Sequence, residues 1–294
     1  MRPKSLMSMA IATLALTLLV QSAGAQKKPP VKPGRDPGGV AIAILTTGIT
    51  YTDPTIAACL ARDGEGDLIG YDVADNDARP WSAYATTNPR GDALIRMIPC
   101  TKGIRIVPIR VDPKVPMTLG RAIDFAAKTP ARIVVVPFAS DAIEDFLPLG
   151  SAADAFRNVL VMVPAGDDLR DIDARPSFPA AFARAGKDWP ALGNVVPVGA
   201  ATGDDRALEN LTNFGPKSVA VTVVEGASDR PAGSDLIASP SIRATIDAAW
   251  SLACSLQPAA TPRDAAELKA RLLSLARPKR GPGGETLLDP GCRK

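Results

Sequence analysis

Residues 104–111 read Ile104-Arg105-Ile106-Val107-Pro108-Ile109-Arg110-Val111 and carry the clearest structural signal in the sequence. Apolar residues stand on both of its alternating faces, which is typical of a strand buried in a parallel sheet. Short apolar runs of the same kind recur before and after it along the chain. They are Val40–Leu45, Leu68–Val73, Ile133–Val136, Val159–Val163, Val195–Val198 and Val219–Val224. The sequence therefore predicts about seven buried strands.

Helical patterns separate these strands and close the domain. They cover Pro54–Arg62, Arg90–Pro99, Met117–Lys128, Asp141–Phe156, Ile242–Leu256 and Pro262–Ala276. Strands that alternate with helices are the signature of parallel strands joined by crossover helices. We therefore predict a three-layer, doubly wound α/β domain, with a mostly parallel sheet flanked by helices, over residues 39–280.

The two ends of the chain have a different composition. Met1–Ala25 is typical of a secretory signal peptide, with Arg2 and Lys4 before an apolar stretch and small residues at the expected cleavage site. Residues 26–38 form a Pro/Gly/Lys-rich segment that we expect to be a disordered linker. Residues 281–294 are expected to be a Gly/Pro-rich tail. The mature protein is thus predicted to be exported, to the periplasm or the extracellular space.

The net charge limits the possible partners. The full chain has 34 basic and 31 acidic residues, and cleavage would remove only Arg2 and Lys4 from them. A nearly neutral mature chain argues against nucleic-acid binding. We also expect no membrane insertion after signal cleavage, because Gln26-Lys27-Lys28 follows the apolar stretch without a stop-transfer pattern.

Four cysteines remain after cleavage, Cys59, Cys100, Cys254 and Cys292, and the chain has no histidine. Their spacing contains no C-x-x-C metal or redox motif, and without imidazole the usual zinc sites are unavailable. Two structural disulfides suit an exported protein better. We favour Cys59 with Cys100 and Cys254 with Cys292 among the three possible pairings. No metal or cofactor site is predicted.

A series of landmarks occurs in a characteristic order along the chain. They are Ile44–Ile49 for V-I-D-T-G-I, Tyr51–Pro54 for Y-x-H-P, Gly70–Asp72 with Asp75–Asp77 for G-Y-D-F-x-x-x-D, Ile104–Val111 for k-I-l-p-v-R-V, Phe178–Ala180 for y-P-A, Val196–Ala200 for v-i-x-V-G-A, and Leu211–Gly215 for F-S-N-Y-G. In this order they resemble the subtilisin-like (S8) serine proteases over nearly the whole mature chain. The resemblance implies a subtilisin-like fold.

The residues that the family uses for catalysis are replaced at each matching position. Thr46 stands where the family has its aspartate, and Arg90 stands where it has its histidine. Leu236 replaces the serine when the segment is aligned from Pro240, and Asp235 replaces it when aligned from Gly233. Asp167 replaces the oxyanion-hole asparagine. Thr46 carries no charge to orient a base, and a protonated Arg90 cannot accept the proton of a serine.

The residues give little support to other routes to catalysis. Ser234, Ser239 and Ser241 lie near the nucleophile position, but without an adjacent base we expect them to be ordinary surface or capping groups. Asp75, Asp77, Asp92 and Asp167 would allow a carboxylate pair near the old cleft, although turn and cap roles are favoured. Sedolisins use a serine, a glutamate and an aspartate instead of a triad with histidine. This chain lacks the S-G-T-S motif that carries their serine.

These observations predict a pseudoprotease, an exported and non-catalytic protein that binds or regulates another exported protein or peptide. Two alternatives stay open. The chain could be a subtilase-type endopeptidase with an unconventional or misaligned site, or a structural or assembly protein in which the fold serves as a spacer.

Overall fold

The computed structural model describes residues 28–81, 90–99, 103–204, 207–225, 238–256, 264–280, 284 and 286–292. The predicted signal peptide and its cleavage site lie outside these ranges. So do Cys100, Ser234, Asp235 and Leu236.

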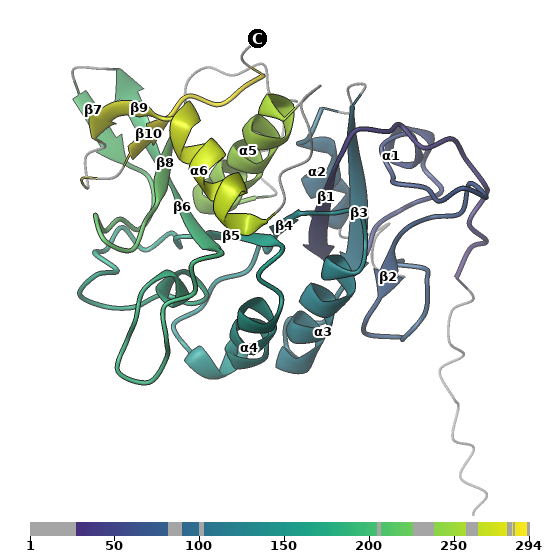
Figure 1. Cartoon of the computed structure of the whole chain (residues 1–294), viewed down its shortest axis with the longest axis horizontal. Helices are drawn as coiled ribbons and strands as arrows, with labels where there is room; N and C mark the ends of the chain where they lie inside the picture. Colours follow the sequence, from purple (N-terminus) through teal and green to yellow (C-terminus); the bar gives the residue numbers. More distant parts are fainter. Residues whose placement is uncertain are drawn as a thin grey trace, which may run out of the picture.

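One sheet organises the molecule (Figure 1). Its strands are β1 (Val40–Thr46), β2 (Tyr71–Asp72), β3 (Ile104–Arg110), β4 (Ile133–Val135), β5 (Leu160–Pro164), β6 (Val195–Asp204), β7 (Ala207–Asn210), β8 (Val221–Glu225), β9 (Arg277–Arg280) and β10 (Thr286–Leu288). They lie in the order β2-β3-β1-β4-β5-β6-β8-β10-β9, and β7 pairs with β6. Among the named strands of the described residues, only the β6–β7 and β9–β10 pairs are antiparallel. The prediction of a mostly parallel sheet is confirmed.

Helices cover both faces of the sheet. They are α1 (Pro54–Ala57), α2 (Arg90–Arg96), α3 (Pro116–Ala127), α4 (Leu147–Ala155), α5 (Pro240–Ser255) and α6 (Ala265–Leu275). Apolar residues of α1, α2, α5 and α6 pack in one core cluster, and those of α3 and α4 pack in the other. Alternate residues of β1 divide between the two clusters, with Ile42 and Ile44 in the first and Ala43 and Leu45 in the second. This is the predicted three-layer arrangement.

Each of the seven predicted strands is present, but some predicted elements are shorter. Only Tyr71–Asp72 of Leu68–Val73 forms a strand, and α1 ends at Ala57. The chain after α1 runs extended instead, because Leu60 and Arg62 form bridges with Ile106 and Leu68. Residues 141–146 precede α4 and include a short 3-10 turn, Ile143–Asp145.

The described part of the predicted linker, residues 28–38, is held against the domain, so the expectation of a disordered segment is wrong there. The Tyr51 hydroxyl donates to the Pro29 carbonyl at 2.7 Å, and the Gly34 amide donates to Gly66 at 2.9 Å. Asp36 accepts from Arg105 at 2.6 Å. We call residues 28–38 the N-terminal strap. A Pro-rich sequence with little apolar periodicity gave no sign of these contacts.

Lys28 fixes the start of the strap. Its ammonium pairs with the fully buried Asp72, and it lies 3.0 Å from Asp75 and 3.1 Å from Asp77. Burial acts to lower the pKa of Lys28, but hydrogen bonds to these carboxylates outweigh burial and raise it above its ordinary value. Arg110 is a second cation on Asp72, at 2.7 Å.

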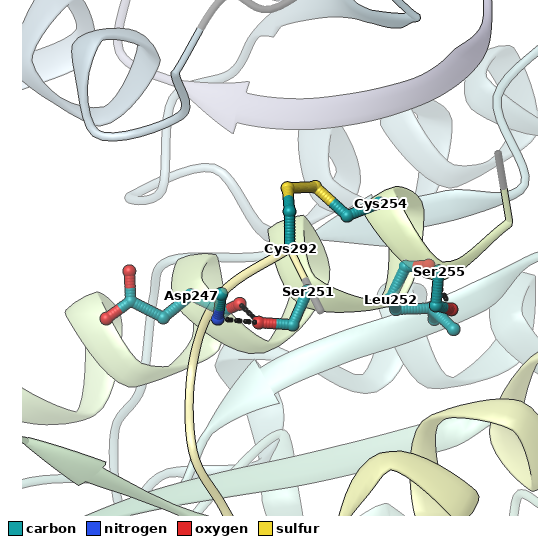
Figure 2. Close-up of a disulfide and its surroundings, with 7 residues drawn as sticks. Asp247, Ser251, Leu252, Cys254, Ser255 and Cys292 are labelled. Carbon is teal, nitrogen blue, oxygen red and sulfur yellow. Dashed lines mark hydrogen bonds between the residues drawn. A yellow bond between two sulfur atoms is a disulfide. The ribbon is translucent and has the colours of Figure 1, made fainter. Parts of the chain in front are cut away.

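The C-terminal segment also joins the domain. β10 pairs in parallel with β8 and buries Leu287 and Leu288, although this segment was expected to be a tail. A disulfide joins Cys254 of α5 to Cys292, as predicted (Figure 2). The Gly291 amide donates to the Ser251 hydroxyl at 2.9 Å, so a hydrogen bond supports the same attachment. Cys59 is disulfide-bonded too. Its predicted partner, Cys100, lies outside the described residues, so the pairing of Cys59 with Cys100 stays a prediction.

A search for membrane spans over the described ranges finds no helix that is both long enough and apolar enough to cross a bilayer.

We predict that Lys28→Met destabilises the mature protein by about 1 to 3 kcal/mol, because it removes one of the two cations on the buried Asp72 while Arg110 remains. Lys28 has a raised pKa, so its stabilisation is fully present below the ordinary lysine pKa of 10.5 and is measurable at neutral pH. Denaturant unfolding at pH 7 measures the loss. Lys32→Met is the matched control, because Lys32 is exposed on the same strap. Equal stability of the two variants would contradict this role of Lys28.

Candidate functional site

Two of the predicted site residues, Thr46 and Asp167, stand at one edge of the sheet. Thr46 is the last residue of β1, and Asp167 follows the end of β5 at Pro164. Both strands run parallel to β4, which lies between them. Because parallel strands end at the same edge, their C-terminal residues converge there, where ligands bind in open α/β sheets.

Thr46 is fully buried and uses its side chain locally. Its hydroxyl accepts a hydrogen bond from the Gly48 amide at 3.0 Å, which stabilises the turn that follows β1. Its side chain carries no charge with which to orient a base.

Helix α2 brings Arg90 next to this turn. Arg90 is exposed at the start of the helix, and a Cβ on the following Gly91 would stand 2.0 Å from the Gly48 carbonyl oxygen. Asp92 accepts from the Thr50 amide at 2.6 Å. Such close packing requires glycine at position 91 and joins α2 to the loop after β1. The structure therefore brings the segments of Thr46 and Arg90 together, whereas Leu236 and Asp235 lie outside the described residues.

The loop that carries Asp167 is held by Asn213, whose role the sequence did not reveal. The Asn213 amide group donates to the Ala165 carbonyl at 2.9 Å, and its oxygen accepts from the amides of Asp168 and Arg170. Gly166 has φ +98°, and a Cβ there would lie 2.4 Å from the Asn213 nitrogen. Asn213 belongs to the landmark Leu211–Gly215, which was noted for its order along the chain but not for this contact.

Asp167 binds the start of the central helix α5. One carboxylate oxygen accepts from the Ser241 amide at 2.9 Å, and the other accepts from the Ser241 hydroxyl at 2.7 Å. Ser241 is the second residue of the helix and is 1% exposed. The carboxylate thus satisfies an amide that the helix itself leaves unpaired, at the positive end of the helix dipole. The interpretation of Ser241 as an ordinary surface or capping group missed its burial and its partner.

A second charged pair lies beside the same helix end. Arg243 donates to Glu225 at 3.0 Å and to the Ala238 carbonyl at 2.8 Å. Arg243 is 7% exposed. A cation is unfavourable near a helix N-terminus, so the pairing with Glu225 compensates for its position. Through Ala238, this pair also fixes the chain immediately before α5.

A cavity of about 360 Å³ lies at this edge. Residues 139–141, 166–168 and Ser177 line it. The carboxylate of Asp141 lies at its rim and accepts two hydrogen bonds from arginines. Arg170 Nη1 donates at 2.9 Å and Arg175 Nη2 donates at 3.1 Å. The hydrogen bond from Arg170 holds the pKa of Asp141 below its ordinary value. The cavity is polar, and arginines beside it pair with the acidic residue Asp141 of its wall.

The four aspartates considered as a carboxylate pair serve separate purposes. Asp92 and Asp167 accept from backbone amides of different segments, and Asp75 and Asp77 face Lys28. These contacts support the turn and cap interpretation. Within the described ranges, no three Asp, Glu or Cys side chains gather where they could hold a metal ion.

No family model and no curated protein matches the chain. Solved structures do match it. A lanthipeptide protease aligns with a TM-score of 0.62 at 16% identity, covering 86% of this chain and 85% of that one. A cold adapted subtilisin-like serine proteinase aligns with a TM-score of 0.62 at 19% identity, covering 91% and 96%.

The nisin leader peptidase NisP from Lactococcus lactis is also similar, with a TM-score of 0.56 at 14% identity over 88% of this chain and 86% of that chain. At these identities the matches show the fold alone. The chain has the subtilisin-like fold that the order of its landmarks predicted.

We predict that Asp167→Ala destabilises the protein by about 1 to 2 kcal/mol, because the Ser241 amide and hydroxyl lose their acceptor at a helix N-terminus. Asp167→Asn keeps one acceptor oxygen and should lose less. Urea unfolding measures the difference. The control is the exposed neighbour Asp168→Ala, which should stay within about 0.5 kcal/mol of the wild type. Equal losses at the two positions would show that the contact with Ser241 contributes nothing.

Proposed function

We propose that this chain is an exported, non-catalytic subtilisin-fold protein that binds a peptide or another exported protein. The observation that carries the proposal is the double hydrogen bond from Ser241 to Asp167. It fills the acceptor position at the start of α5 with a carboxylate of the chain itself. A substrate oxyanion that approached this carboxylate would be repelled, whereas catalysis requires donors aimed at the oxyanion.

The other positions agree with the same interpretation. Peptide hydrolysis by a serine requires a neutral base next to the hydroxyl and a group that orients this base. Thr46 is neutral and bonded to its own turn. The guanidinium of Arg90 has hydrogen-bond donors and no acceptor. Neither residue can perform the step that its matching position performs in the subtilisin-like proteases.

The pair of Ser241 and Asp167 also bears on the alternative of an unconventional peptidase. A hydroxyl 2.7 Å from a carboxylate has the geometry of a nucleophile with its base. A nucleophile must reach a substrate carbonyl, however, and Ser241 is 1% exposed within the first turn of α5. Its burial favours a structural role over attack on a peptide.

The test of the non-catalytic state is an assay of the mature protein, residues 26–294, with a generic peptide substrate and a serine-directed phosphonate probe. We expect neither turnover nor covalent labelling, while an active subtilisin-type protease reacts with both. Turnover that is abolished by Ser234→Ala, Ser239→Ala, Ser241→Ala or Asp235→Asn would overturn the proposal and support the peptidase alternative.

Binding is tested by affinity capture from the exported fraction with the mature protein as bait. We expect a partner whose capture is lost with Asp168→Arg, which reverses a charge in the wall of the 360 Å³ cavity. Asp188→Arg is the matched control, because it reverses an exposed charge on a residue that does not line this cavity. A clean monomer without a partner would favour the spacer alternative. A partner retained equally by both variants would place binding away from this cavity.

A further inference from the structure

The N-terminal strap encloses a second and larger hollow. Its volume is about 1020 Å³, and it lies between the strap and the segment that contains α1. In Figure 1 the strap is the purple chain that passes beside α1. Pro30, Pro33 and Pro37 line it from the strap, and Tyr51, Pro54 and Ala57 line it from the domain. Thr46, Arg90 and Asp167 do not take part, so the hollow is separate from the site described above.

Arg62 is the unusual group in this hollow. Its side chain lines the wall, yet the residue is only 5% exposed. One terminal nitrogen donates to the Lys32 carbonyl at 3.0 Å and to the Gly66 carbonyl at 3.4 Å. Its Nε is buried without a hydrogen-bond partner. In the part of the chain that the structure describes, no carboxylate lies within ion-pair distance of this guanidinium.

A buried charge without a counter-ion is costly. Burial lowers the pKa of Arg62, opposed by the more distant charges of Asp67, Asp36 and Asp63. The guanidinium nevertheless stays protonated at physiological pH. It therefore offers a permanent positive charge and a planar set of donors that the chain uses only in part. Carboxylates and phosphates match this donor geometry best.

The other charged residues of the hollow do not neutralise the guanidinium of Arg62. Lys32 and Arg35 line it and are exposed. Asp36 lines it too, but its oxygens accept from Gly38, from the Arg62 amide and from Arg105 at 2.6 Å. Burial acts to raise the pKa of Asp36, but these hydrogen bonds outweigh burial and hold the pKa below its ordinary value. The carboxylate is therefore ionised, and Arg105 already neutralises its charge. The hollow thus presents three cations and one neutralised acid.

We propose that this hollow binds an organic anion, a carboxylate or phosphate group on an apolar body. Arg62 would receive the anionic group, and Lys32 and Arg35 would add attraction at the entrance. The proline rings and Tyr51 would contact the apolar body. Most small-molecule sites combine an apolar wall with a few fixed polar groups in this way.

The test is isothermal titration of the mature protein with phenyl phosphate, with benzoate, and with the neutral benzyl alcohol. We expect the two anions to bind, the alcohol to bind at least tenfold more weakly, and added salt to weaken the anions. The stronger anion identifies the preferred group. Arg62→Gln should weaken anion binding at least tenfold. The double variant Lys32→Ser with Arg35→Ser should weaken it severalfold.

Lys187→Ser, an exposed cation outside the hollow, is the control and should bind like the wild type. Arg62→Gln removes a buried group, so its fold is checked by circular dichroism. If it does not fold, the double variant of the two exposed residues decides. Absence of anion binding, equal binding of benzyl alcohol, or unchanged binding in the double variant would each overturn the proposal.

Discussion

The parallel pairing of β1 with β3 and β4 fixes the positions of the other elements. β1 is matched to β3 in an unbroken register from Val40 with Ile104 to Thr46 with Arg110. Because β1 lies inside the sheet and sends alternate side chains into both cores, it cannot slip by one residue without exchanging its two faces. Its end at Thr46 is thereby fixed at the edge where the chain leaves β5 for Asp167. The arrangement of the candidate site is a consequence of strand register.

At this edge, charges that could act on a substrate are bonded within the chain instead. Asp167 holds Ser241, Arg243 holds Glu225, and Asp92 holds the Thr50 amide. A catalytic site keeps strained or unsatisfied groups available at a cost in stability, whereas groups that satisfy one another contribute to stability. Arg62 differs, because its charge is buried against backbone carbonyls with no carboxylate within ion-pair distance among the described residues. Its environment is therefore that of a ligand site more than that of a structural ion pair.

The sequence predicted the centre of the fold well and its periphery poorly, for a physical reason. Buried parallel strands such as Ile104–Arg110 must be apolar on both faces, so each leaves a local signal. The strap has no such signal, since Lys28 is held by carboxylates that are 44 or more residues away. β10 is only three residues long and follows a Gly/Pro-rich stretch, which hid it among turn residues. At the site, the substitution of Asp167 was visible, but its partner Ser241 is 74 residues away and no local pattern connects the two.

The position of the candidate site lets its side chains vary without loss of the fold. Thr46 ends β1, Arg90 begins α2 and Asp167 follows β5. The two cores consist instead of residues from strand interiors and helix faces. Replacing a catalytic side chain at a strand end removes little buried apolar area, and that area dominates stability. The N-terminal amides of α5 still need an acceptor, because the helix itself leaves them unpaired. Asp167 supplies that acceptor to Ser241 and so stabilises the start of α5. In the non-catalytic function that we propose, the same carboxylate also repels a substrate oxyanion.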